Sequence, residues 1–238
     1  MKGVFALLLA TSLLSACSSS QTAAPTASSA SSQSTTVETT TSSAPPTQTG
    51  QQSPPDVAPE HAIRAVRAIE VRFSKLDPRL ADGIRAVSGI ESTVRCWTKP
   101  GWKRLEKIMH RSLSGLADTG VYEIHLHPFA CQGVRFLLAG NQPESGDEAL
   151  FVAEGLVVLT HEGTHFTSAG SNEAVVECRA MQNAHLVAAR LGIDEDYARH
   201  LARLYWEQAY PRNDPVYGSP ECRDGGIMDV NPDSSDWP

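Results

Sequence analysis

From position 59 onward, apolar residues recur at the three- and four-residue steps typical of helices that bury one face. Shorter stretches alternate between apolar and polar residues, as half-buried strands do. The pattern predicts helices over residues 59–76, 80–87, 101–110, 148–165, 173–191 and 194–210, and strands over residues 93–97 and 121–127. We therefore expect an α+β fold, mostly helical, in which a small antiparallel sheet packs with the helices.

The first residues follow a different pattern. Lys2 precedes a mostly apolar run, Val4–Leu14, which is too short to cross a bilayer but has the length of a signal-peptide core. The run ends in Leu14-Ser15-Ala16-Cys17. This ending resembles the lipobox of bacterial lipoproteins, although an ordinary signal peptide with a chance cysteine and a short buried helix are the alternatives. The resemblance implies that residues 1–16 are removed, and that Cys17 carries a lipid anchor on the extracytoplasmic face of the cell membrane.

Composition divides the rest of the chain into two parts. Residues 18–55 contain no aromatic residue and a single charged one, Glu38, so they cannot bury enough apolar surface to offset the entropy of ordering. We expect residues 17–57 to be a disordered tether and residues 58–238 to be a single domain. The net charge of -7 argues against nucleic acid as a partner, because phosphate binding requires a basic face.

Four cysteines remain once Cys17 is assigned to the lipid. An even number of cysteines in an exported domain predicts disulfides, and four cysteines allow three pairings. We favour Cys96–Cys131 and Cys178–Cys222, because each pair joins neighbouring segments. The chain has no Cys-x-x-Cys spacing, which argues against a cysteine-rich zinc site.

The segment His161-Glu162-Gly163-Thr164-His165 matches the pattern His-Glu-x-x-His at the end of a predicted helix. Residues four apart lie on one face of a helix, so both imidazoles can reach a single ion. Neutral imidazole is a good ligand for Zn²⁺. Glu162 lies beside that face, where its carboxylate can take a proton from an attacking water. The pattern therefore predicts a zinc-dependent hydrolase.

A catalytic zinc ion usually has three protein ligands. Glu173 opens the next predicted helix, and a short turn between two helices would bring it beside the histidine pair. Glu177 lies one turn further on the same face, where it can hold a ligand histidine by its other ring nitrogen. Spacing alone leaves open which of the two carboxylates is the third ligand, and both could instead belong to a solvated helix face.

Together, His161-Glu162-x-Thr164-His165 and Asn172-Glu173-Ala174-x-x-Glu177-Cys178 resemble the gluzincin, thermolysin-like metallopeptidases over fewer than 20 residues. They also resemble a group of exported actinobacterial lipoproteins. The resemblance implies that His161, His165 and Glu173 bind zinc, that Glu162 is the general base and that Glu177 supports a ligand. It implies cleavage of peptide bonds in a peptide or protein substrate. The separation between the two motifs is much shorter than in thermolysin, and Glu177 replaces the usual Asp.

Other residues and functions also have to be considered. His125 and His127 could be additional ligands, but we expect them on the exposed face of an edge strand. His185, Tyr217 and Arg223 are unranked candidates for stabilising the oxyanion of the reaction. The alternative functions are a non-catalytic, zinc-stabilised binding module of the envelope, and an adhesion or assembly lipoprotein in which the motif is a coincidence.

Overall fold

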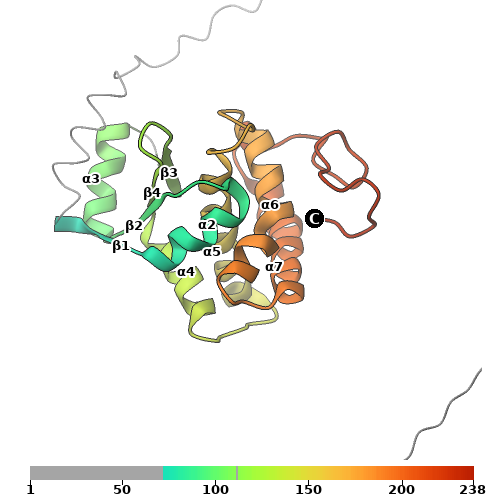
Figure 1. The fold of residues 1–238 in the computed structure, drawn as a ribbon, viewed down its shortest axis with the longest axis horizontal. Coiled ribbons are helices and arrows are strands. Elements are labelled where there is room, and N and C mark those ends of the chain that lie inside the picture. Colours follow the sequence, from blue (N-terminus) through green and yellow to red (C-terminus); the bar gives the residue numbers. More distant parts are fainter. Residues whose placement is uncertain (1–71, 111) are drawn as a thin grey trace, which may run out of the picture. The chain divides into compact units, whose positions relative to one another are not determined.

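The computed structural model describes residues 72–110 and 112–238, and over these residues helices predominate beside a small sheet (Figure 1). The α+β fold is therefore confirmed. The helices are α2 (Pro78–Ser88), α3 (Lys99–Met109), α4 (Pro128–Leu138), α5 (Gly146–Thr164), α6 (Glu173–Arg190) and α7 (Glu195–Gln208). The strands are β1 (Ser74–Leu76), β2 (Thr93–Trp97), β3 (Gly115–Asp118) and β4 (Glu123–Leu126). Two 3₁₀ turns, η1 (Tyr210–Arg212) and η2 (Pro215–Tyr217), follow α7.

The sheet is mixed, so the expectation of an antiparallel sheet is wrong. Its strand order is β1-β2-β4-β3, with β4 parallel to β2 and the two outer pairs antiparallel. After β2, the chain runs through α3 and β3 before it returns as β4 in the direction of β2. A consequence is that β3 forms one edge of the sheet while β4 lies inside it.

The predicted helix over residues 59–76 lies mostly outside the described residues, as do the expected lipidation site at Cys17 and the expected tether. Its last three residues are a correction, because Ser74–Leu76 form strand β1 rather than helix. Lys75 pairs with Cys96 of β2 in that strand. The residue before a proline disfavours the helical region, so Asp77, which precedes Pro78, separates β1 from α2.

Helix α5 is the centre of the helical part, and α2, α4, α6 and α7 all contact it. Twelve of its 19 residues are buried, which explains why apolar residues cover nearly all of its faces. Helix α4 approaches α5 closely where two glycines meet: a Cβ on Gly155 would lie 3.2 Å from the Cα of Gly133. The end of α5, which carries most of the His-Glu-x-x-His segment, is likewise buried within the core.

Both predicted disulfides are present in the structure. Cys96–Cys131 joins β2 to α4 across 35 residues of sequence, and Cys178–Cys222 joins α6 to the C-terminal segment across 44. No helix in the described ranges has both the length and the apolar character needed to cross a bilayer.

Candidate metal centre

The two histidines of the motif occupy the last turn of α5. The helix ends at Thr164, but the backbone of His165 keeps helical dihedral angles (φ -58°, ψ -23°). The two imidazoles therefore share one face, with ring centroids 4.9 Å apart. His161 and Glu162 are buried, with 7% and 6% of their surface exposed. A buried imidazole needs hydrogen-bond partners, and the neighbouring helix supplies two of them, Glu173 and Glu177, to His161.

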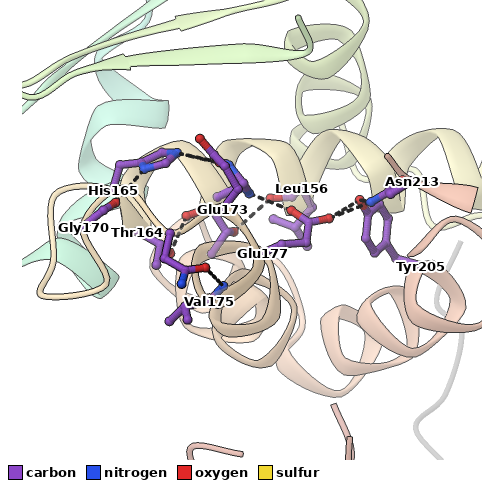
Figure 2. Close-up of polar contacts among 12 residues, drawn as sticks. Leu156, Thr164, His165, Gly170, Glu173, Val175, Glu177, Tyr205 and Asn213 are labelled. Atoms are coloured by element: carbon purple, nitrogen blue, oxygen red, sulfur yellow. Dashed lines mark hydrogen bonds and ion pairs between the residues drawn. The ribbon is translucent and has the colours of Figure 1, made fainter. Parts of the chain in front are cut away.

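A short reversal brings α6 back beside these histidines. Gly170 adopts a left-handed conformation (φ 64°), and its carbonyl oxygen lies 2.9 Å from Nδ1 of His165. Asn172 then caps α6, because its side chain accepts a hydrogen bond from the backbone N–H of Val175. The helix consequently begins at Glu173, as predicted, with this carboxylate facing the histidine pair (Figure 2).

Three side-chain atoms converge at this point. Nε2 of His161 lies 3.2 Å from Nε2 of His165 and 3.1 Å from Oε2 of Glu173. Nε2 of His165 lies 3.5 Å from the same Glu173 oxygen. Zinc bonds of 2.0–2.1 Å in tetrahedral geometry place neighbouring ligand atoms about 3.3 Å apart. His161, His165 and Glu173 could therefore hold a metal ion.

Glu177 takes a different position from Glu173. Its Oε2 lies 2.6 Å from Nδ1 of His161, the ring nitrogen that faces away from the triad. Its other oxygen, Oε1, accepts hydrogen bonds from the hydroxyl of Tyr205 and from Nδ2 of Asn213 (Figure 2). The geometry thus separates the two carboxylates, with Glu173 in the triad and Glu177 behind His161.

Electrostatics at the site are dominated by carboxylates. Burial disfavours the charged form of His161, but hydrogen bonds to Glu173 and Glu177 outweigh burial and raise its pKa to about 10. Burial acts in the same direction on His165, and a hydrogen bond to Glu173 reverses it, so that this pKa also rises. The hydrogen bond between His161 and Glu173 in turn lowers the pKa of Glu173, and the bond to His165 adds to this effect. The carboxylates therefore favour a cation here, and metal binding would displace any proton on the two Nε2 atoms.

A cavity of about 490 Å³ opens beside the triad. Glu162 lies in its wall, and burial of this carboxyl raises its pKa. Strand β3 forms the facing wall, and a Cβ built on Gly115 would lie only 2.3 Å from Oε1 of Glu162. The lining residues are Leu113, Gly115, Leu116, Ala117, Thr119, His161, Glu162, His165, Gly170, Ser171, Glu173 and Tyr217. Glu162 therefore borders both the triad and an open space.

The structure corrects the interpretation of His125 and His127. His125 lies in the interior strand β4, is 4% exposed and accepts a hydrogen bond from Nε1 of Trp97. His127 follows the strand and caps α4, because its Nδ1 accepts the N–H of Phe129. Neither is on an exposed edge, because β3 rather than β4 forms this edge of the sheet.

The three oxyanion candidates separate as well. Tyr217 lines the cavity, with its ring 5.7 Å from that of His161. His185 instead lies 3.9 Å from Glu195 on α7, and the guanidinium of Arg223 contacts the carbonyl of Asp224. Sequence reasoning missed Gly115, Tyr205 and Asn213, since no motif links them to the two helices.

None of the family models, curated proteins or solved structures with which the chain was compared matches it. The function is therefore inferred from the chemistry of the site.

Proposed function

We propose that the protein is a zinc-dependent hydrolase that cleaves peptide bonds at the extracytoplasmic face of the cell envelope. The observation that carries the proposal is the convergence of His161, His165 and Glu173 beside a cavity that Glu162 also borders. When bound, zinc would polarise the scissile carbonyl and lower the pKa of the attacking water. On this proposal the two histidines and Glu173 hold the metal.

Glu162 is suited to moving the proton of the reaction. Its carboxylate borders the cavity, and burial raises its pKa from the ordinary value of a glutamic acid. A general base with a raised pKa takes a proton from water more readily and can then give it to the leaving amine. Tyr217 lies on the same cavity and is our candidate for donating a hydrogen bond to the developing oxyanion.

A peptide substrate is favoured by the edge strand β3. In an antiparallel ladder every second residue bonds to the partner strand. Ser114 is such a residue, because its carbonyl accepts a hydrogen bond from the N–H of His127, so Gly115 and Ala117 are the residues between. The main-chain groups of Gly115 and Ala117 consequently point away from β4, and both residues line the cavity. An extended peptide can add to such an edge through main-chain hydrogen bonds. The site would then present a scissile bond to Glu162.

The test pairs zinc binding with peptidase activity. We expect wild type to bind one zinc ion by elemental analysis and to cleave members of a broad peptide library. His161→Ala and Glu173→Gln each remove a proposed ligand, so each should lower the zinc affinity by more than about 100-fold. Loss of a residue that only supports a ligand lowers affinity by roughly 10–100-fold. Glu162→Gln should keep zinc and the fold but lose about 10²–10⁴-fold in rate, because an amide cannot accept the proton.

His185→Ala is the matched control, because this histidine belongs to α6 but lies outside the triad. It should bind zinc and cleave peptides as wild type does. Equal zinc binding by all variants would refute the metal site. Zinc binding without cleavage of any peptide would instead support a non-catalytic, zinc-stabilised binding module.

A further inference from the structure

Glu177 is the centre of a buried polar network that reaches beyond the two motif helices. The residue is 4% exposed, and both of its carboxylate oxygens are engaged. Oε2 faces Nδ1 of His161 at 2.6 Å, while Oε1 accepts from Tyr205 and, at 3.0 Å, from Asn213. Nδ2 of Asn213 also donates to the Tyr205 oxygen at 2.9 Å. These bonds fix the rotation of the carboxylate as well as its position.

The partners of Glu177 come from separate elements. Tyr205 belongs to α7 and is 5% exposed, and Asn213 directly follows η1. The C-terminal segment then returns to α6, since Cys222 bonds to Cys178, the residue after Glu177. Gln182, one turn further along α6, donates to the carbonyl of Met228 and accepts from the N–H of Val230. The segment that carries Asn213 is thus attached to α6 beside Glu177.

We propose that Tyr205 and Asn213 are positioning residues of the metal site, and that the Cys178–Cys222 disulfide keeps Asn213 in place. This inference rests on the proposed function, because it assigns a role only if the triad binds zinc. By holding Oε1, the two residues aim Oε2 at Nδ1 of His161. A proton on Nδ1 then donates to Glu177, and the lone pair of Nε2 is left for the metal. Zinc affinity should therefore depend on groups that do not contact the metal.

Variants that remove the two donor groups test the two hydrogen bonds. Tyr205→Phe and Asn213→Ala should each weaken zinc binding about 10-fold, measured by competition with a chromophoric chelator. The matched control is Tyr197→Phe, also on α7, whose hydroxyl donates to the carbonyl of Pro143 at 2.8 Å. It should bind zinc within twofold of wild type. All measurements are made where circular dichroism shows each variant to be folded.

Cobalt provides a readout that a purely structural role would not change. In the Co²⁺-substituted protein, the visible absorption bands report the geometry of the ligands around the ion. Tyr205→Phe and Asn213→Ala should shift these bands, because His161 can then turn, whereas Tyr197→Phe should leave them as in wild type.

The disulfide arm uses the second bridge as its control. Cys178→Ser/Cys222→Ser should weaken zinc binding about as much as Asn213→Ala does. Cys96→Ser/Cys131→Ser removes the bridge between β2 and α4, neither of which carries a hydrogen-bond partner of Glu177, and should not change zinc binding in the folded protein. If either double variant does not fold, the point variants still decide.

The outcomes separate the two proposals. A wild-type protein that binds no zinc overturns the proposed function and this inference with it. If wild type binds zinc while Tyr205→Phe and Asn213→Ala match it in affinity and cobalt spectrum, only the positioning role is overturned. The same conclusion follows if Tyr197→Phe weakens zinc binding equally.

Discussion

The pKa values of two buried histidines, His125 and His161, shift in opposite directions because the residues around them differ. Burial lowers the pKa of His125 to about 4, and the attraction of Glu123 does not reverse this. His161 is buried to a similar degree, but carboxylates contact both of its ring nitrogens and raise its pKa. His125 instead accepts a hydrogen bond from Trp97, which requires an unprotonated Nδ1. One histidine is therefore a neutral part of the core, and the other belongs to a site that favours a cation.

The neutral state of His125 predicts a pH dependence of folding. An unfolded chain protonates this residue below a pKa of about 6.5, whereas the folded protein resists protonation until about pH 4. The unfolded state thus binds more protons than the folded state between these two pH values. The contribution of neutral His125 to stability is therefore complete above pH 6.5 and is lost as the pH falls towards 4. His125→Asn keeps an acceptor for Trp97 but does not titrate.

The measurement is the free energy of unfolding in urea from pH 7.5 to 4. The advantage of wild type over His125→Asn should shrink by up to about 3 kcal/mol over this range. A difference that stays constant with pH would show that His125 is not held neutral.

At the scale of elements, the helices and strands that could be predicted are those whose sequence pattern is long and local. Helices α5 and α6 have long periodic patterns, and Asn172 is a strong capping residue, so their bounds were close to those predicted. No helix is predicted over residues 128–138, because Pro128 directly follows the predicted strand over residues 121–127 and a proline can also mark the end of a strand. In the structure Pro128 opens α4, where its missing N–H is tolerated. Strand β3 was missed because Gly115–Asp118 is short and does not alternate.

The same reasoning applies to the site. The predicted site residues come from two helices joined by a short turn, so spacing along the chain was enough to bring them together. They are His161, Glu162, His165, Glu173 and Glu177. Three other contributions required the tertiary fold. They are the wall formed by Gly115, the support of Glu177 by Tyr205 and Asn213, and the entry of Tyr217 into the cavity.

The contact between β3 and α5 gives a prediction about Gly115. An alanine methyl group there would lie 2.3 Å from Oε1 of Glu162, so either the strand or the carboxylate must move. We expect Gly115→Ala to lower the peptidase rate at least 10-fold, to cost about 1–3 kcal/mol of stability, and to change zinc affinity only slightly. Gly120→Ala is the control, because its methyl group would meet only the end of the Asp118 side chain at 3.3 Å. Full activity of Gly115→Ala would contradict the place assigned to Glu162.

For the whole molecule, the two disulfides bear on where the protein works. Disulfides persist in oxidising compartments and are rare in the cytosol. Cys96–Cys131 and Cys178–Cys222 each close a loop of a length for which chain entropy predicts about 3–4 kcal/mol of stabilisation. Stabilisation of this size would be lost in a reducing environment. The disulfides therefore agree with the export that the resemblance of Leu14-Ser15-Ala16-Cys17 to a lipobox implies.

We propose on this basis that Cys17 carries a lipid that anchors the folded domain to the membrane. Cys17 is distant in sequence from residues 72–238, which contain the described helices and strands, so Cys17→Ser should change location without changing the fold. The variant should appear in the soluble fraction or remain as an unprocessed precursor, whereas wild type should sediment with membranes and partition into detergent. Ser18→Ala is the neighbouring control and should behave as wild type. A Cys17→Ser protein that stays in the membrane with unchanged electrophoretic mobility would show that this cysteine is not the anchor.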